Sequence, residues 1–542
     1  MSDPGSHLEY RSLRAPREDG AAMVEPPWER TSALVAANLD LRAGYDVDLA
    51  GRRLAELTRE ARRELFDAAV RWTSAYRDVD ASRWDPAGKF FLAGHQPQLF
   101  HPGVWFKNFA LDALARQHAA VAINLIVDSD TIKTSSVRVP GGSPAQPQVA
   151  LIPFDASGPV VPFEERRILD RDTFVQFGAR AAGQIAPLVP DPLVREYWPL
   201  AADRARQLDT LGACLAQSRH QWEGRWGGST LEVPQSWVCQ LPAFARFTVH
   251  LLAGLSRLRL IYNTAVAEYR RLHRIRSTAH PVPDLAVEGP WIEAPYWIWT
   301  EQDPRRRRLF VRERRHEIVL SDLHGLEVAL PGGEAGRAAE RLAELPGQGI
   351  RLRCRALITT LWARLVLGDV FLHGIGGAKY DHVTDAVIER FFGLTPPGFL
   401  VLSATLLLPV PRQRLRGDEA RCIAKRLRAL DWHPETAIDG PPSPGGFASG
   451  TEWPELAAAK ARWIATTPTP DNARTRWLEI RRLNRALQPW VSQARQQLLT
   501  ERSALAAALR AEAILGWREY AFCLYPGRSL TDFFGRLLPK TA

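Results

Sequence analysis

Cysteine, methionine and lysine are scarce in this chain of 542 residues. There are five cysteines and two methionines, and seven of the 70 basic residues are lysine, so the other 63 are arginine. The cysteines are odd in number and never at metal-ligand spacing, so we expect no disulfide framework and no structural zinc site. None has an activating histidine nearby in the sequence, which predicts inert thiols in a reducing cytoplasm. They are Cys214, Cys239, Cys354, Cys422 and Cys523.

Long apolar runs are absent as well. No stretch reaches the roughly 18 consecutive apolar residues that favour a membrane-spanning helix. Residues 1–20 are polar and lack the apolar core of a signal peptide. The sequence therefore predicts a cytoplasmic protein without a membrane partner.

The positive charge of the chain is dispersed. The formal net charge is +10, which invites comparison with nucleic-acid-binding proteins. The one dense basic stretch, residues 305–315, alternates arginine with apolar residues, and we interpret it as the solvated face of a strand rather than a phosphate-binding patch. Nucleic acid is therefore not an expected partner.

The chain does contain a clear pattern of strand, turn, helix and strand. Residues 89–93 and 121–127 are short apolar runs, and residues 104–118 carry apolar side chains at helical spacing. Buried parallel strands have this form, and a helix between two of them predicts a βαβ unit. The length predicts about two to four folding units. The predicted fold class is α/β with a parallel sheet.

The rest of the chain alternates between helical and strand-like segments. Residues 49–78 predict an amphipathic helix, residues 140–192 irregular structure or a small subdomain, and residues 237–273 a strand followed by a helix. Residues 295–314 predict a β-hairpin. Further on, we expect a strand ending at residue 374, a helix over residues 383–393 and a strand over residues 398–409. A linker is expected over residues 441–446, with helices beyond it to about residue 520.

These elements suggest five segments. They are an N-terminal helical segment (1–88), the first part of the core (89–235), a connective region with the hairpin (236–345), the second part of the core (346–410), and a linker with C-terminal helices (411–542).

Three polar segments follow predicted strands, at the positions where open α/β sheets bind ligands. The first is the turn at Gly94, His95 and Gln96. The following helix would direct its N-terminus at this turn, where backbone N–H groups attract phosphate or carboxylate. We predict substrate-binding roles for all three residues. The alternative is a loop that only turns the chain.

The second segment contains two carboxylates. Asp128 and Asp130 would lie on one side of an extended strand, close to Ser129 and Lys133. Carboxylates in this position hold Mg²⁺, orient an amine or act as a general base. We predict catalytic roles for the two aspartates and substrate binding by Ser129 and Lys133, and we assign no metal ligand. The alternative is a cluster that caps a turn.

The third segment, HGIGGAKYDH (373–382), is rich in glycine. Glycines let backbone approach a ligand, and a lysine there would neutralise a phosphate or carboxylate. We predict substrate-binding roles for Gly374, Gly376, Gly377 and Lys379. Tyr380, Asp381 and His382 are further polar candidates for the same crevice. Neither the GxxxxGK[ST] nor the GxGxxG nucleotide fingerprint is present, and the alternative is a tightly packed glycine turn.

The same segments resemble the motifs of one enzyme family. AGHQPQLFHPGVWFKN (93–108) resembles the opening TGQQxGLFTGPxxxxxK segment of the bacillithiol biosynthesis cysteine-adding enzymes. INLIVDSDTIK (123–133) takes the place of their strand ending in EDHD, and residues 373–393 are similar to their GGPGExxYWxxLxxxFxxFG segment. Residues 518–538 resemble their closing segment, so the order of landmarks spans nearly the whole chain.

This resemblance implies a Rossmann-like core of nucleotidyltransferase type with connective inserts, and a C-terminal helical coiled-coil arm that forms a homodimer. It also implies a ligase-like activity that joins an amino acid to the amine of a small-molecule amino-sugar conjugate. By position, the Gly94–Gln96 turn, Asp128, Asp130 and residues 374–377 would line the active cleft.

Three departures from the family motifs leave the substrate open. The family's GQQ has become Gly94-His95-Gln96, Ser129 stands at the family's histidine position, and Ala378 and Lys379 stand where its loop has a glutamate. A second hypothesis therefore stays open, a non-catalytic small-molecule-binding or interaction scaffold on the same fold. The cofactor is open too, with a nucleotide and Mg²⁺ as the candidate.

Overall fold

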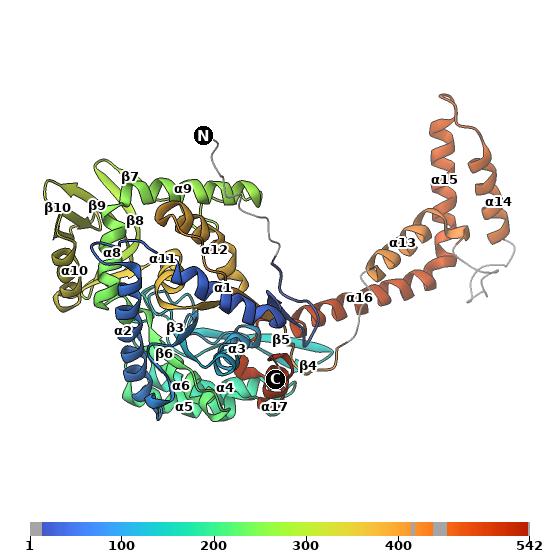
Figure 1. Ribbon diagram of the computed structural model, residues 1–542. Coiled ribbons are helices and arrows are strands. Elements are labelled where there is room, and N and C mark those ends of the chain that lie inside the picture. Colours follow the sequence, from blue (N-terminus) through green and yellow to red (C-terminus); the bar gives the residue numbers. More distant parts are fainter. Residues whose placement is uncertain (1–12, 413–417, 437–451, 540–542) are drawn as a thin grey trace. The chain divides into compact units, whose positions relative to one another are not determined.

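A computed structural model describes residues 13–412, 418–436 and 452–539 (Figure 1). The chain divides into two compact units. The first comprises the described residues through Gly141, Val149–Pro409, and those from Arg518 onward; the second comprises Gly142–Gln148 and the described residues of Val410–Trp517. The expected linker at residues 441–446 lies outside the described residues.

A six-stranded sheet forms the centre of the first unit, in the order β1-β14-β13-β2-β3-β6. Five of its strands run parallel, and β1 pairs antiparallel to β14 at one edge. The expected α/β class with a parallel sheet is confirmed. The strands are β1 (Ala22–Glu25), β2 (Lys89–His95), β3 (Ala120–Ile126), β6 (Leu231–Pro234), β13 (Val370–His373) and β14 (Leu400–Ala404).

The predicted βαβ unit is confirmed as β2, α3 (Pro102–His118) and β3, with the two strands paired in parallel. Phe90, Phe91 and Leu92 of β2 are all fully buried, because both faces of the sheet are covered, as is usual for parallel strands. Helix α3 begins at proline, which suits the first helical position.

Gly103 in the first turn of α3 lies directly against β14. A Cβ atom at this position would come 1.9 Å from the carbonyl oxygen of Ala404. Only glycine allows this approach, so α3 starts at the sheet edge where β14 ends.

A second parallel crossover runs from β13 through α12 (Ile375–Val387) to β14. The expected helix over residues 383–393 starts too late, because α12 already begins at Ile375 after the N-cap Gly374. A π-helical turn (Ile388–Phe392) continues α12, and the helix ends at Gly393, whose φ of 71° is left-handed as expected for a C-cap glycine. Gly376 and Gly377, which the sequence predicted to lie in a loop, are therefore part of the first turn of α12.

A second, antiparallel sheet has the order β11-β10-β9-β8-β12, with β7 paired to β8. The expected hairpin is confirmed by the pairing of β8 with β9. The strands are β7 (Val287–Glu288), β8 (Trp291–Thr300), β9 (Arg307–Arg314), β10 (Glu317–Ser321), β11 (Glu327–Pro331) and β12 (Ile350–Cys354).

The strand expected at the start of residues 237–273 is wrong. The segment is helical: α7 (Gln235–Val238), α8 (Pro242–Ala253) and α9 (Leu255–Leu272) follow one another. Its apolar residues pack into the largest hydrophobic core together with residues of β2, β3 and β8, and burial on that scale overrides weak strand preferences. Residues 140–192, expected to be irregular or a small subdomain, contain the second half of β4 (Ser136–Ser143), its partner β5 (Gln146–Pro153) and helix α4 (Arg171–Ile185).

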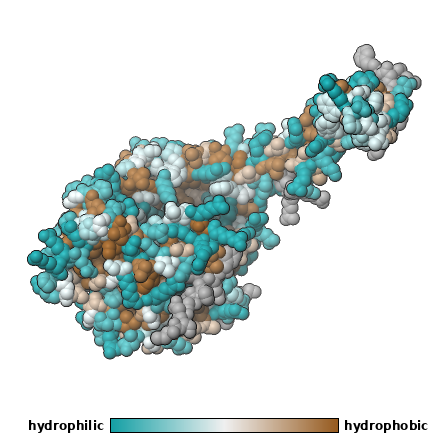
Figure 2. Space-filling view, turned by 90° about the horizontal axis from the view of Figure 1, so that it is seen from above, coloured by the Kyte–Doolittle hydropathy of each residue, from teal (hydrophilic) through white to brown (hydrophobic). Residues whose placement is uncertain are grey.

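The remaining helices of the first unit include α2, which confirms the helix expected over residues 49–78. They are α1 (Thr31–Ala43), α2 (Leu54–Ser74), α5 (Val194–Gln207), α6 (Leu211–Arg225), α10 (Ala335–Glu344), α11 (Ala356–Trp362) and α17 (Gly527–Leu537). Among the described residues, no helix is long and apolar enough to cross a bilayer. On the face shown in Figure 2, hydrophobic residues lie in small groups among hydrophilic ones.

The second unit is mainly helical. Helix α13 packs on α16, and α14 packs on α15. The sequence predicted helices to about residue 520, but the last of them, α16, ends at Leu515. The helices are α13 (Glu419–Trp432), α14 (Glu452–Ala465), α15 (Ala473–Leu487) and α16 (Ser492–Leu515).

Candidate functional site

A cavity of about 990 Å³ lies in the first unit, where β2, β3 and β13 end. Its volume is at the upper end of the range of small-molecule sites. The three polar segments that follow these strands meet in its wall, as the sequence analysis expected. The predicted site residues that line it are Gly94, His95, Gln96, Ser129, Asp130, Gly374, Gly376, Gly377 and Lys379.

Lys133 and Asp128 lie elsewhere. Lys133 is exposed and outside the cavity lining. The Asp128 carboxylate accepts hydrogen bonds from the backbone N of Ser236 at 2.9 Å and from its hydroxyl at 2.5 Å, next to another pocket of about 400 Å³. The expectation that Asp128 and Asp130 share one side is wrong, because β3 ends at Ile126 and the chain turns after it.

The environment of Asp128 suits a carboxyl group that holds its proton. Burial raises its pKa to about 7, and the neighbouring Glu164 carboxylate adds to the rise. Hydrogen bonds from Ser236 to the carboxylate oppose the rise without cancelling it. Asp128 therefore stabilises the first turn of α7 and does not line the cavity.

Asp130 faces the cavity within a set of hydrogen bonds. Gln96 Nε2 donates to Oδ2 at 3.1 Å, and Arg306 Nη1 lies 3.2 Å from Oδ1. Arg306 also donates to the carbonyl oxygen of Ser129 at 2.9 Å. The interpretation of residues 305–315 as a solvated strand face is thus wrong for Arg306, which precedes β9 and lines the cavity.

Arg355 brings a second guanidinium group to the cavity wall. Arg355 and Arg306 both lie over the Trp297 ring, with Cζ 4.2 Å and 4.8 Å from its centroid. Arg355 is 8% exposed, and its Nη2 donates to Glu293 at 2.7 Å. Its Nε and Nη1 are buried without a hydrogen-bond partner among the described residues, and the guanidinium group adds positive charge beside the cavity.

Lys107 is buried and His95 is half-buried in the same wall. Lys107 Nζ donates to the carbonyl oxygen of Gly94, and burial, together with Arg219, lowers the pKa of Lys107 to about 7. Burial, and then Lys107, lowers the pKa of His95 to about 3. His95 is therefore neutral at physiological pH, whereas Lys107 can gain or lose a proton there.

His373, at the end of β13, also lines the cavity. Its Nε2 lies 2.7 Å from Asp381 Oδ2, and Arg364 Nη1 donates to the same carboxylate oxygen at 2.7 Å. With the proton on Nε2, Nδ1 keeps a free lone pair. His373 belongs to the third polar segment but was assigned no role, and its presence in one polar segment with Asp381 was the available signal.

The N-terminus of α12 faces the cavity through Gly374, Ile375 and Gly376. The first backbone N–H groups of a helix lack intrahelical partners and attract anions. Lys379 and Arg518 line the same cavity. With the positive charge of Arg355, these groups make the cavity a candidate for binding phosphate or carboxylate.

One group of potential metal ligands occurs among the described residues: His220, Glu223 and Glu232, all buried. Arg219 donates to Glu223 at 2.6 Å and to Glu232 at 2.5 Å, and the ring nitrogens of His220 contact Tyr76 and the Thr230 carbonyl oxygen. Glu232 Oε2 has no hydrogen-bond partner among the described residues, but the other ligand atoms are engaged within the cluster, which is best explained as a buried ion-pair network.

No family model matches this chain, and none of the curated proteins compared with it matches its sequence.

Proposed function

We propose that the protein is a ligase-like enzyme that forms an amide between an amino acid and the amine of an amino-sugar conjugate. The observation that carries this proposal is the cavity beyond β2, β3 and β13, which combines anion-binding donors, a carboxylate and a histidine held by a carboxylate. The motif resemblance supplies the substrate class. The proposal includes a Rossmann-like core of nucleotidyltransferase type, for which the parallel crossovers β2-α3-β3 and β13-α12-β14 are the support.

Amide formation needs an activated acyl group, such as an acyl phosphate or adenylate. The amine nitrogen attacks the acyl carbon, the nitrogen–carbon bond forms, and the bond to the phosphate oxygen breaks with its electron pair leaving on phosphate. The nitrogen loses a proton in this step. His373 Nδ1 accepts this proton, while Asp381 stabilises the resulting imidazolium through Nε2.

The other cavity residues bind the two partners of the reaction. The N-terminus of α12, Lys379 and Arg518 hold the phosphate group, and Asp130 orients the amine. A nucleotide would bring Mg²⁺ with its phosphates, and Glu519 is the further cavity carboxylate that fits as its ligand.

One observation favours the second hypothesis, a non-catalytic binding protein. The Asp130 carboxylate is already engaged by Gln96 and Arg306, which suits a fixed wall as well as a group that orients an amine. Under this hypothesis the cavity binds its ligand but catalyses no reaction, and His373 does not act as a base.

The proposal also includes a homodimer formed through a coiled-coil arm of C-terminal helices. Its support is the exposure of large apolar side chains on α13 and α15, including Trp432 (49% exposed) and Trp477 (51% exposed). Sedimentation equilibrium tests it: Trp477→Glu should shift a dimeric protein toward the monomer. A monomeric wild type would exclude it.

The function is tested by ligand binding and product formation in parallel. Thermal shifts of the wild type would be measured with amino acids, amino sugars, ATP and Mg²⁺, and amide products would be sought by mass spectrometry. We expect Asp130→Asn and His373→Gln to keep the thermal shift with ATP but to form no amide. Ligand binding without any product from the wild type would instead establish the non-catalytic protein.

A further inference from the structure

Two of the five cysteines meet beside the cavity. Cys354 ends β12 and lines the cavity, and Cys239 follows α7 at its C-cap. Their Sγ atoms are 3.6 Å apart although 115 positions separate them in the sequence. The neighbours of each cysteine in the sequence predict inert thiols. In the fold, side chains that are distant in the sequence contact the two sulfurs.

The two thiols have different surroundings. Gln235 Nε2 donates to the Cys354 sulfur at 2.9 Å, and the hydroxyl of Thr359 lies 3.3 Å from it. Burial alone would raise the pKa of Cys354, but hydrogen bonds from Cys239, Thr359 and Gln235 outweigh burial and lower it. Burial raises the pKa of Cys239 well above its usual range. Cys354 is therefore the better nucleophile, and Cys239 is placed to attack it in turn.

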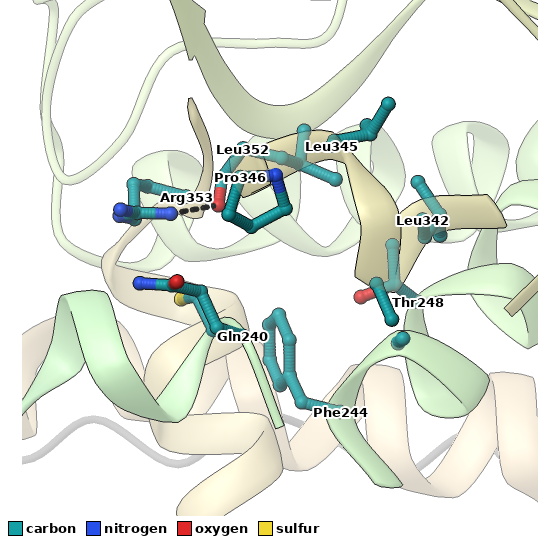
Figure 3. Close-up of a pocket in the computed structure, with 11 residues that line it drawn as sticks. Gln240, Phe244, Thr248, Leu342, Leu345, Pro346, Leu352 and Arg353 are labelled. Carbon is teal, nitrogen blue, oxygen red and sulfur yellow. Dashed lines mark hydrogen bonds between the residues drawn. The ribbon is translucent and has the colours of Figure 1, made fainter. Parts of the chain in front are cut away.

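The two cysteines also border different pockets. Cys354 borders the cavity of about 990 Å³, whereas Cys239 borders a pocket of only about 10 Å³. Figure 3 shows this pocket between Gln240 and Phe244 on one side and Pro346 and Arg353 on the other. Cys354 itself is only 4% exposed, which favours small oxidants over bulky disulfides.

We propose that Cys354 and Cys239 form an oxidisable pair that hydrogen peroxide or a small hydroperoxide converts into an intramolecular disulfide. The Cys354 thiolate attacks a peroxide oxygen, the O–O bond breaks, and Cys354 becomes a sulfenic acid while water or an alcohol leaves. The Cys239 sulfur then attacks Cys354, the S–S bond forms, and the sulfenic oxygen leaves as water. Two thiols lose two electrons and two protons in total, and one peroxide is reduced.

The test uses the full chain carrying Cys422→Ser, which removes an exposed thiol. The protein is treated with hydrogen peroxide and mapped without reduction by mass spectrometry. We expect a mass loss of two hydrogen atoms and one cross-linked peptide pair that contains Cys239 and Cys354, both reversed by dithiothreitol. Stable sulfinic acid on Cys354 without this cross-link would overturn the proposal.

Two further variants in the same background separate the roles of the sulfurs. In Cys239→Ser, oxidation should stop at Cys354 sulfenic acid, which dimedone traps, whereas Cys354→Ser should give neither cross-link nor adduct. Cys523→Ser, at a buried cysteine whose pKa burial raises to about 12, serves as the matched control and should behave like the parent. An equal dimedone adduct in the parent protein would contradict the role of Cys239. None of these readouts depends on the proposed ligase activity.

Discussion

The Asp381 carboxylate lies 2.7 Å from Nε2 of His373, and both side chains are almost fully buried. Burial would raise the pKa of Asp381, but Arg364 and His373 outweigh it and hold the pKa well below its usual range. An ionised carboxylate at this distance fixes the proton of His373 on Nε2 and its lone pair on Nδ1. The arrangement is that of a general base held in one orientation.

We predict that His373→Gln reduces amide formation by about 10²–10⁴-fold, the usual contribution of a general base. Glutamine retains a polar side chain but accepts no proton near neutral pH. Turnover would be measured alongside the thermal shift with ATP, which should persist. His316→Gln, at an exposed turn residue, is the control, and full activity in His373→Gln would refute the assignment.

The pH dependence of turnover should separate His373 from the carboxylate that positions it. Burial lowers the pKa of His373 while Asp381 opposes that effect, so the acid limb of the kcat profile should lie below pH 6.5 or so. In Asp381→Asn the opposing charge is lost, which lowers the pKa further and moves the limb to more acidic pH. A purely structural Asp381 would reduce kcat without moving the limb.

Gly377 in the first turns of α12 and Gly336 in the first turn of α10 form a matched pair of helical glycines. A Cβ atom on Gly377 would come 2.7 Å from His373 Nδ1, whereas one on Gly336, outside the cavity, would meet no atom within 4 Å. Alanine in a helix is otherwise favoured over glycine by about 1 kcal/mol. We predict that Gly377→Ala displaces His373 and loses turnover, while Gly336→Ala keeps turnover and raises the melting temperature. Equal activity of the two variants would contradict this prediction.

Local sequence pattern was enough to predict the strands β2, β3 and β13 that lead to the cavity. Short apolar runs place the ends of β2 and β13 within two residues of His95 and His373, where they end, and their meeting follows from the parallel pairing of neighbouring strands. Other cavity residues had no predicted role. Arg306 directly precedes β9 and Arg355 directly follows β12, so both are positioned by the second sheet. Nothing in local periodicity indicates which arginine of a chain so rich in arginine will lie beside Asp130.

Helix and strand ends limited the prediction at two other positions. The side of the sheet that Asp128 faces depends on the strand continuing past Ile126, and it ends there. The start of α12 was placed too late because Gly376 and Gly377 have low helix propensity, which tertiary packing overrides. Both errors concern boundaries, where propensities are weakest.

Lys107 should couple anion binding to proton uptake. Its pKa of about 7 follows mainly from burial, and an anion in the cavity would raise that pKa by stabilising the ammonium form. At about pH 8, binding of ATP should therefore take up part of a proton. Calorimetry in buffers of different ionisation enthalpy measures this uptake. It should disappear in Lys107→Met, and identical uptake in that variant would assign it to another group.

The last prediction concerns Asp128 and the stability of the fold. The folded-state pKa of about 7 lies above the ordinary value of 3.8, so the folded protein binds the Asp128 proton more tightly than the unfolded chain does. This contribution is fully present below the ordinary value and is lost as the pH rises through about 7. It amounts to about 4 kcal/mol at most.

Replacing Asp128 by asparagine removes the titrating group and should flatten the loss of stability between about pH 4 and pH 8. Urea unfolding at a series of pH values measures the free energy of unfolding for wild type and variant. Ser236→Ala is the matched variant: its hydroxyl donates to Asp128 at 2.5 Å and lowers the carboxyl pKa, so its removal should extend the loss of stability to higher pH. If Asp128→Asn retains the pH dependence of the wild type, the carboxyl group that holds its proton lies elsewhere.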